Sequence, residues 1–481
     1  MTEHLNSPIK FGTDGWRGII AKDFTFDNVR ICAQATADYL KQSGLAGRGI
    51  IIGYDTRFAS EDFAAACAEV MAGNGIKVFL CDKAAPTPVV SYGTLAGKAG
   101  GAIVITASHN PGAWNGFKIK NEAGSSAPPE VTRIIESGIA RILDAGNIKQ
   151  MALPKGRQQG LIEDVDLAPS YFNKIKTLVD VDSLRSSKLK IHVDSMWGAG
   201  AGYLKTLLTG GNLKISEIHG SRNPLFPEMH QPEPIAVNLT ALSTAVKNEN
   251  SAVGLATDGD ADRMGAVDEN GVFITQLQVF ALLCLYLLEV RGESGPIVKT
   301  LNTTSMAYSL GKLFNVPVFE TPVGFRFVAP MMEKNDAIIG GEESGGYGFR
   351  GHVLERDGIL ANLYFLDLIA KTKKTPSELI AYLYDKVGTH YYERRDVSFP
   401  EEARKSILER LRQNQPADVA GVKVKRVDTV DGFRYTLEDG AWLLIRFSGT
   451  EPLLRIYAED GSLEHVEKLL AGGKRLAGIQ D

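Results

Sequence analysis

The chain has 481 residues, which is too long for one hydrophobic core and predicts several domains of ordinary size. Hydrophobic residues make up 44% of the chain and charged residues 23%, a balance that excludes a disordered or fibrous protein. The 53 lysines and arginines nearly balance the 57 aspartates and glutamates, and the net charge of -4 argues against a general binder of nucleic acids or anionic membranes. A local basic pocket for a small phosphorylated ligand remains compatible with this charge.

The cysteines and the N-terminal segment predict a reduced, cytoplasmic protein. The four cysteines lie far apart, without the C-x-x-C spacing of redox or metal sites, and suggest no disulfide framework. The segment "MTEHLNSPIK" lacks the apolar core of a secretory signal. The longest apolar run, residues 279–288, stops at Glu289, is too short to span a membrane, and predicts a buried helix. We expect no nucleic-acid or membrane partner, and the sequence indicates no protein partner.

Residues 26–108 are expected to alternate between helix and strand, which is the pattern of an α/β domain. Segments with helical spacing alternate with short β-branched runs, such as "GIIIGYD" and "GAIVITAS", that end in polar residues. The expected helices cover 26–44, 59–75 and 86–97, and the expected strands cover 49–55, 77–82 and 101–108.

The same alternation recurs twice, whereas the C-terminal part of the chain differs. The expected strands of the repeats cover 188–195, 213–220, 251–258, 296–300, 316–321 and 336–344, and a helix at 276–290 separates the two sets. After these repeats, β-like runs and a terminal helix predict a smaller α+β domain. We therefore expect an α/β protein with three similar α/β domains and a smaller fourth domain, at residues 1–165, 166–275, 276–388 and 389–481.

Three segments share one pattern, in which an apolar run gives way to a polar loop of small residues. They are "GAIVITASHN", "SAVGLATDGD" and "DAIIGGEESG". Open α/β sheets place their ligands beyond the carboxyl ends of strands, so the pattern predicts a structural repeat with three loops facing one site. Coincidence is the alternative, since any α/β protein has several strand ends.

The segment "TDGDADR" predicts a metal site. Asp258, Asp260 and Asp262 would repel one another unless a hard cation or basic groups neutralise them, and Mg²⁺ is the natural guest. The aspartate spacing also starts like an EF-hand, but Arg263 occupies the sixth position, where that loop needs glycine, and the flanking segments resemble strands. A solvated acidic turn is the remaining alternative.

Ser108 in "TASHNP" is either a phosphate carrier or the polar start of a turn. The segment lacks the G-x-S-x-G elbow of esterases, and His109 is poorly placed as a triad base because neighbouring residues of an extended chain point to opposite faces. If Ser108 carried a phosphate, a dication could bridge that phosphate and the three aspartates. Such a cation would be needed to offset the repulsion between them.

Two further loops offer ligand-binding groups. In "GGEESGGYG", Glu342, Glu343 and Ser344 are acceptors suited to sugar hydroxyls, although an acidic loop that starts a helix would look similar. The segment "RFSGTEPLLR" is either a surface hairpin or a phosphate-binding loop. Its candidate phosphate donors are Arg446, Ser448, Gly449, Thr450 and Arg455. No Walker A motif is present, which argues against a P-loop kinase.

Taken together, five motifs in this order resemble the α-D-phosphohexomutase family, which includes phosphoglucomutases and phosphomannomutases. They are "FGTDGWRG", "TASHNPGAWNGFK", "TDGDADR", "GEESGG" and "RFSGTEP". The resemblance covers essentially the whole chain. It implies three α/β domains with mixed sheets and a smaller C-terminal domain, arranged around a central cleft. It also implies an enzyme that moves a phosphoryl group between the 1- and 6-oxygens of a hexose phosphate.

The resemblance also implies roles for individual residues. Ser108 would be the phosphoserine, and Asp258, Asp260 and Asp262 would hold one Mg²⁺ together with a phosphate oxygen on Ser108. Glu342 and Ser344 match the sugar-binding loop, and the segment from Arg446 to Arg455 matches the phosphate-binding loop. The basic residues around the reacting phosphate would be Arg17, His109, Lys118 and Arg263. Lys118 is the preferred general acid/base and His109 the second choice, while glucose 1,6-bisphosphate would be intermediate and activator.

Glucose phosphates are the favoured substrates, with mannose phosphates possible. The segment "TPVGFRF" resembles the Gly-Phe-Lys segment of phosphoglucomutases, with Arg326 where lysine is usual, and "GEESGG" is similar to the sugar loop of glucose-type members. Both segments disfavour an aminosugar mutase. Two alternatives are a glucose 1,6-bisphosphate synthase on the same scaffold and a non-catalytic sugar-phosphate sensor, although the intact serine and aspartates speak against the sensor.

Overall fold

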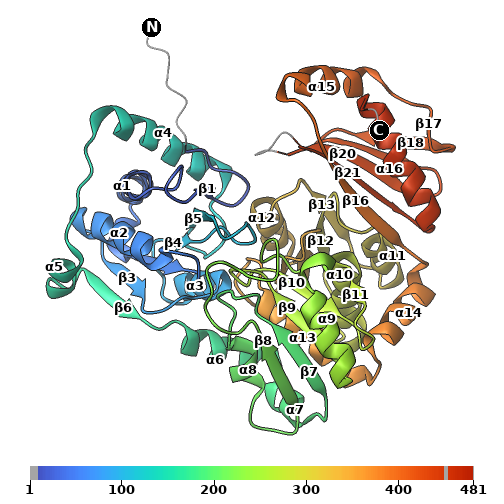
Figure 1. The fold of residues 1–481 in the computed structure, drawn as a ribbon, viewed down its shortest axis with the longest axis horizontal. Helices are drawn as coiled ribbons and strands as arrows, with labels where there is room; N and C mark the ends of the chain where they lie inside the picture. The colour runs from blue at the N-terminus through green and yellow to red at the C-terminus, as the bar shows by residue number, and fades with distance from the viewer. Residues whose placement is uncertain (1–8, 449–452, 480–481) are drawn as a thin grey trace.

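The computed structural model describes residues 9–448 and 453–479, and four β-sheets organise them into domains I to IV in chain order. Domains I, II and III meet at the middle of the molecule, and domain IV lies beside domain III (Figure 1). The sheets lie within the four ranges predicted from the sequence, and the expected fold class, three mixed α/β domains plus a smaller α+β domain, is confirmed. The predicted boundaries between the domains stay a prediction.

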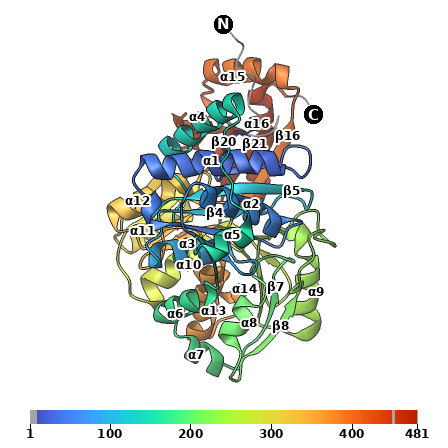
Figure 2. The ribbon, with the colours of Figure 1, turned by 90° about the vertical axis from the view of Figure 1, so that its left-hand side faces the viewer.

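Domain I contains a six-stranded sheet with helices on both faces. Its strands, in spatial order, are β1 (Trp16–Ile19), β5 (Trp114–Lys120), β4 (Ala102–Ile105), β2 (Ile50–Tyr54), β3 (Val78–Cys81) and β6 (Ile162–Val165). Its helices are α1 (Phe26–Gln42), α2 (Ser60–Gly73), α3 (Thr87–Ala96), α4 (Pro129–Ala145) and α5 (Leu153–Gln158). Figure 2 shows α1 and α4 together on one side of the sheet. Alternate residues of β2 pack into two different apolar clusters, as expected for a parallel strand that is covered on both faces.

Domains II and III follow the same plan with fewer strands. The sheet of domain II contains, in order, β11 (Phe273–Ile274), β10 (Met264–Val267), β9 (Val253–Thr257), β7 (Lys190–Asp194) and β8 (Lys214–Ile218). The sheet of domain III contains β13 (Val318–Thr321), β12 (Ile297–Thr300), β14 (Ile339–Gly341) and β15 (Tyr347–Phe349). The main helices are α6 (Ala168–Leu178), α7 (Val181–Ser186), α8 (Tyr203–Leu208), α9 (Thr240–Glu249), α10 (Gln276–Leu285), α11 (Met306–Leu313), α12 (Phe325–Asn335), α13 (Gly358–Thr372) and α14 (Pro376–Val387).

One four-stranded unit therefore occurs three times. In domain I, β2 pairs in parallel with β3 and β4, and β4 pairs antiparallel with β5. The pairings of β7, β8, β9 and β10 repeat this arrangement, as do those of β12, β13, β14 and β15. The three polar segments noted in the sequence follow the equivalent strands β4, β9 and β14. The structural repeat predicted from these segments is present.

The apolar cores do not follow the domains one to one. Domain I and domain IV each have a large cluster of their own, whereas one cluster spans domains II and III. Helix α10 contributes every residue from Val279 to Leu285 to this shared cluster, and a capping box formed by Thr275 and Gln278 starts the helix. The helix predicted over 276–290 is present, although its last turn, Tyr286–Val290, is a π-helix. Within the described part of the chain, no helix combines the length and apolar character needed to cross a membrane.

Domain IV has a different topology. Its sheet is antiparallel throughout and contains β16 (Tyr391–Ser398), β21 (Leu453–Asp460), β20 (Trp442–Phe447), β19 (Phe433–Leu437), β18 (Val422–Asp428) and β17 (Asp418–Val419). Helices α15 (Arg404–Gln413) and α16 (Leu463–Ala477) pack on it through the apolar cluster of this domain. A small cluster around Trp442 and Leu301 joins domain IV to domain III.

Candidate active site

Ser108 lies in a loop after β4 whose strained backbone is held in place by hydrogen bonds. Its side chain is buried, and its φ of 53° falls in the left-handed region that a non-glycine residue seldom adopts. The backbone amide of Ser108 donates to Thr106 Oγ1 at 2.9 Å. The guanidinium of Arg57 donates to the carbonyl of Ser108 and to that of Asn110, each at 2.6 Å, while Asp55 holds Arg57 Nε at 3.0 Å. The buried guanidinium group of Arg57 thus fixes the conformation of the Ser108 loop.

The aspartate loop after β9 faces Ser108 directly. Asp258, Asp260 and Asp262 are completely buried, and one carboxylate oxygen from each lies within 4.8 Å of the others. Ser108 Oγ donates to Asp258 Oδ2 at 2.9 Å. Between the first two aspartates, a Cβ on Gly259 would come within 2.4 Å of the Ser108 carbonyl, so only glycine allows this approach. Two loops whose contacting residues are 150 positions apart in the sequence therefore share one site.

Lys118 neutralises part of the charge of these carboxylates. Its Nζ lies 2.8 Å from Asp260, 3.1 Å from Asp262 and 2.7 Å from Asp14. Although burial opposes the charged form, these three carboxylates raise the pKa of Lys118. Burial raises the pKa of Asp260, but Lys118 more than offsets this effect and the net shift is downward. Burial, Asp260 and Asp262 together raise the pKa of Asp258 well above its usual value.

The same carboxylates fit a hard divalent cation. Asp260 Oδ1 and Asp262 Oδ1 are buried and have no hydrogen-bond partner among the described residues. Leaving a buried carboxylate oxygen without a partner is costly, and oxygen ligands of this kind are those that Mg²⁺ prefers. The carboxylate cluster could therefore hold a metal ion, as the spacing in the sequence predicts.

The other basic residues predicted from the sequence also lie around Ser108. His109 is half-buried, with Nδ1 at 3.3 Å from Ser108 Oγ. Burial, followed by the positive charges of Arg263, Arg17 and Lys118, lowers the pKa of His109 well below its usual value, so the imidazole is neutral at pH 7. Arg17 donates to Asn110 Oδ1 at 2.5 Å, and the backbone amide of Arg263 donates to Asp258 Oδ1 at 3.0 Å.

The loop after β14 brings Glu342 and Ser344 to the same region. The loop is a tight hairpin, in which the amide of Glu342 donates to the carbonyl of Gly346 at 3.0 Å, and it starts no helix. Glu342 is buried, which raises the pKa of its carboxyl group, and it lies 3.6 Å from Arg356. Ser344 is half-buried. Of the two alternatives left open by the sequence, the helix-starting loop is excluded.

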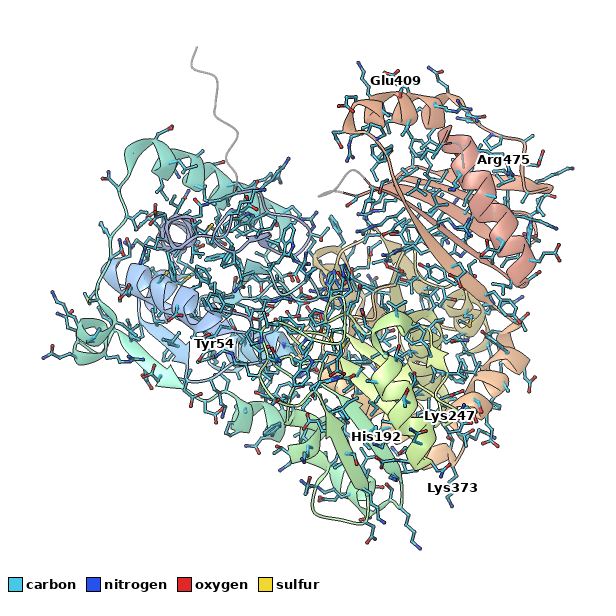
Figure 3. All side chains as sticks on the ribbon, viewed as in Figure 1. Tyr54, His192, Lys247, Lys373, Glu409 and Arg475 are labelled. Atoms are coloured by element: carbon cyan, nitrogen blue, oxygen red, sulfur yellow. The ribbon has the colours of Figure 1, made fainter. Side chains whose placement is uncertain are left out.

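Arg356 and Asp14 are functional candidates that the sequence analysis missed. Arg356 forms ion pairs with Asp262 at 2.8 Å, with Glu342 at 3.6 Å and with Asp14, so one guanidinium contacts a loop of each of the first three domains. A signal was present in the sequence, because "LERDG" places three charged residues directly before a buried helix. Asp14 lies inside the quoted motif "FGTDGWRG" and could have been paired with Lys118. Side chains from the three domains fill this central region (Figure 3).

The arginines of the predicted phosphate loop are neighbours in domain IV. Arg446 on β20 and Arg455 on β21 are directly paired across the strands. Like charges in this position repel, so the pair favours an anion beside it. Each arginine has a carboxylate nearby, Asp431 at 2.9 Å from Arg446 and Asp396 at 3.8 Å from Arg455. Ser448 is buried, whereas Gly449 and Thr450 lie outside the described residues.

Two contacts connect the sugar loop and the Arg326 segment to other domains. The hydroxyl of Tyr392, on β16 of domain IV, donates to Glu343 Oε1 at 2.7 Å. Arg326, near the start of α12, donates through Nη1 to the carbonyl of Gly12 in domain I at 3.0 Å. Domain IV and domain I therefore both contact the part of domain III that carries the candidate sugar-binding residues.

Comparison with known proteins covers nearly the whole chain. Four family models match in order: "Phosphoglucomutase/phosphomannomutase, alpha/beta/alpha domain" I at residues 8–145, II at 169–271 and III at 276–387, followed by the C-terminal domain at 405–472. A phosphoglucomutase/phosphomannomutase of Thermococcus kodakarensis is 33% identical over 97% of this chain and 98% of its own length. A probable phosphoglucosamine mutase of Methanosphaera stadtmanae is 31% identical, with 96% of each chain covered.

Solved structures give the same result. The crystal structure of a putative phosphomannomutase from Thermus thermophilus superposes with a TM-score of 0.85 at 36% identity and covers 98% of this chain and 100% of its own. A phosphoglucomutase from Paramecium in an open form has a TM-score of 0.80 at 22% identity, with 99% of this chain and 96% of that chain covered, and shows the shared fold.

Proposed function

Because the chain belongs to the α-D-phosphohexomutase family, we propose that it interconverts hexose 1-phosphates and hexose 6-phosphates through a phosphoserine at Ser108 and a bisphosphorylated sugar. The observation that carries this proposal is the position of Ser108. Its hydroxyl is buried 2.9 Å from Asp258, and a hydrogen bond from the Arg57 guanidinium holds the strained backbone of its loop. A serine that served only to start a turn would not need this support or this neighbour.

The proposed metal site uses the carboxylates of Asp258, Asp260 and Asp262, together with an oxygen of the phosphate on Ser108. When bound, Mg²⁺ would offset the negative charge of these carboxylates and of the phosphoryl group. The buried oxygens of Asp260 and Asp262 without partners support this assignment. Arg17 and Arg263 add positive charge around the same phosphate, as the low pKa of His109 reflects.

The chemistry requires one phosphoryl transfer in each direction. In the first, a sugar hydroxyl attacks the phosphorus on Ser108, the bond from phosphorus to Ser108 Oγ breaks, and a bisphosphorylated sugar forms. After that sugar turns end for end, the seryl oxygen attacks the phosphorus of its other phosphate, the bond from that phosphorus to the sugar oxygen breaks, and the hexose monophosphate leaves. The first transfer needs no base to activate Ser108, because the serine begins each cycle already phosphorylated.

Lys118 and His109 are the proposed proton-transfer residues. The hydroxyl that attacks loses a proton and the oxygen that leaves gains one, so each transfer needs a base and an acid. Lys118 is held in its charged form by three carboxylates and can start as the acid. His109 is neutral and can start as the base. We propose that Lys118 and His109 divide the acid and base functions between them. From the sequence, Lys118 is the preferred residue for both functions and His109 the second choice.

Glucose phosphates are the proposed substrates. Glu342 and Ser344 would bind sugar hydroxyls, and Arg326 stands where phosphoglucomutases carry lysine. The relatives include a phosphoglucomutase/phosphomannomutase, a putative phosphomannomutase and a probable phosphoglucosamine mutase, so the comparisons do not choose among the three sugars. A cytoplasmic location and the absence of macromolecular partners stay predictions of the sequence.

The test compares three substrates in coupled assays: glucose 1-phosphate, mannose 1-phosphate and glucosamine 1-phosphate. We expect the highest kcat/KM for glucose 1-phosphate, and a clear preference for either other sugar would contradict the substrate assignment. Mass spectrometry of peptides after incubation with glucose 1,6-bisphosphate should find the phosphate on Ser108. Accumulation of glucose 1,6-bisphosphate as the final product, instead of hexose 6-phosphate, would identify a bisphosphate synthase.

A further inference from the structure

Asp431 connects Arg446 of the predicted phosphate loop to a loop of domain III. It lies in the turn between β18 and β19 of domain IV. Its Oδ1 accepts a hydrogen bond from Arg446 Nε at 2.9 Å, and its Oδ2 accepts one from the backbone amide of Val323 at 2.9 Å. Val323 belongs to the loop between β13 and α12 in domain III. The two oxygens of one carboxylate thus contact two domains.

The turn that carries Asp431 is closely fitted against the sheet. Gly432, the next residue, has a φ of 103°, and a Cβ there would lie 2.6 Å from the carbonyl of Ile445. Ile445 immediately precedes Arg446 on β20. Only glycine allows this approach, so the turn places the Asp431 carboxylate beside the Arg446 side chain.

The pair is only partly buried. The Arg446 side chain is 14% exposed and that of Asp431 is 23% exposed, and both line a cavity next to α15. Among the described residues, Asp431 is the polar partner of the Arg446 side chain, and it accepts a hydrogen bond from Nε. An arginine held at Nε keeps its two terminal nitrogens for an incoming anion, and an ordered guanidinium loses less conformational entropy on binding.

The loop held by Asp431 leads directly to Arg326. Val323 and Gly324 precede α12, and Gly324 has a φ of 126°. Arg326, three residues after Val323, contacts the Gly12 carbonyl of domain I. The short segment from Val323 to Arg326 is therefore attached to domain IV at one end and to domain I at the other.

We propose that Asp431 is a positioning residue that orders Arg446 for phosphate binding and ties it to the domain III loop that leads to Arg326. The proposal rests on the proposed function and adds to it that Arg446, in the predicted phosphate loop, binds the phosphate that is not being transferred. Asparagine at this position can accept from only one of the two donors, because its amide group replaces one acceptor oxygen with a donor. Asp431→Asn therefore cannot hold Arg446 and Val323 at the same time, so each contact is lost for part of the time while the size of the side chain is kept.

The experiment combines Asp431→Asn and Arg446→Ala in a double-mutant cycle. Asp431→Asn should raise KM for glucose 1-phosphate about tenfold and change kcat less than about twofold, since the contact persists into the transition state. In the Arg446→Ala background, Asp431→Asn should add almost nothing to KM. Asp428→Asn is the matched control, because Asp428 lies on the same hairpin and contacts Arg426 and the Val430 amide. It should leave KM unchanged.

A second readout does not depend on turnover. Amide hydrogen exchange in a peptide covering residues 319–325 should accelerate in Asp431→Asn, because the Val323 amide loses its acceptor, and should stay unchanged in Asp428→Asn. If Arg446→Ala raises KM but Asp431→Asn alters neither KM nor exchange, the role of Asp431 is refuted and the proposed function stands. If Arg446→Ala leaves KM unchanged, the assigned role of Arg446 falls, and the positioning role falls with it. Additive effects in the double variant would mean that Asp431 acts on something other than Arg446.

Discussion

The serine and aspartate loops and the arginine pair of domain IV both concentrate charge, but they hold it differently. In the first region the three aspartates of the metal loop are wholly buried, and Lys118 and Arg356 each contact carboxylates of more than one domain. In domain IV, Arg446 and Arg455 are partly exposed and each has one carboxylate nearby. Preorganised buried charge suits a step in which charge develops, whereas partly exposed arginines suit reversible binding of an anion. Changes in the two regions should therefore affect kcat and KM differently.

The largest expected effect belongs to Ser108→Ala. Loss of the phosphate carrier should lower kcat by at least ~10⁴-fold, because uncatalysed phosphate-ester cleavage is among the slowest reactions known. The free energy of unfolding should change by only about 1 kcal/mol, since one hydrogen bond to Asp258 is lost. A coupled assay and denaturant titration measure both quantities. Ser137→Ala, on the exposed part of α4, is the control. An active alanine variant would make Ser108 a turn residue and nothing more.

Asp260→Asn comes next. The change removes one negative charge from the proposed cation site and weakens a partner of Lys118, so kcat should fall roughly a hundredfold or more. The measurement is kcat as a function of Mg²⁺ concentration, with inactivation of the unmodified enzyme by EDTA and recovery on adding Mg²⁺. Asp182→Asn, on the exposed part of α7, should behave like the unmodified enzyme. Near-normal activity of Asp260→Asn across the titration would rule out the metal assignment.

Arg455→Ala tests the arginine pair of domain IV and should have a smaller effect. KM for glucose 1-phosphate should rise about tenfold while kcat changes little, because a contact made equally in the ground and transition states affects only binding. Arg426→Ala on β18, whose side chain is 63% exposed, provides a control in the same sheet. A loss of kcat with unchanged KM would place Arg455 in the chemical step and remove the distinction between the two regions.

The smallest effect concerns the contact between domains III and IV. Glu320 on β13 pairs with Lys299 at 3.0 Å and with Arg434 of domain IV. Although burial opposes ionisation, Lys299 and Arg434 lower the pKa of Glu320 to about 2. A carboxylate with a lowered pKa stabilises the folded state fully above its ordinary pKa of 4.5, and this stabilisation is lost as the pH falls toward 2.

Glu320→Gln should therefore destabilise the protein at pH 7 by about 1–3 kcal/mol, and the difference from the unmodified protein should shrink as the pH falls below 4.5. Denaturant unfolding at a series of pH values measures it. Glu333→Gln, an exposed position on α12, should show no such trend. A difference that is constant with pH would mean that the charge of Glu320 contributes nothing to the contact between the two domains.

The sequence by itself determined the elements and the repeat. Alternating helical and β-branched segments are local signals, because helix and strand periods depend on neighbouring residues, and the strands β4, β9 and β14 lie where their apolar runs predicted them. The polar ends of these strands marked the loops that carry Ser108, Asp258 and Glu342. Short-range patterning was enough, since each loop follows directly from the strand before it.

Only the tertiary structure decided which charged groups meet. Arg356 lies almost a hundred residues from Asp262, at a sequence separation that no periodic pattern encodes, yet the two are 2.8 Å apart. The same holds for Asp431, whose two partners come from different domains. The shared apolar core of domains II and III could not be predicted from the sequence either. The sequence of a helix indicates that one of its faces is apolar but not which sheet covers that face. Ion pairs and packing depend on distance in space, and distance in space is set by the whole fold.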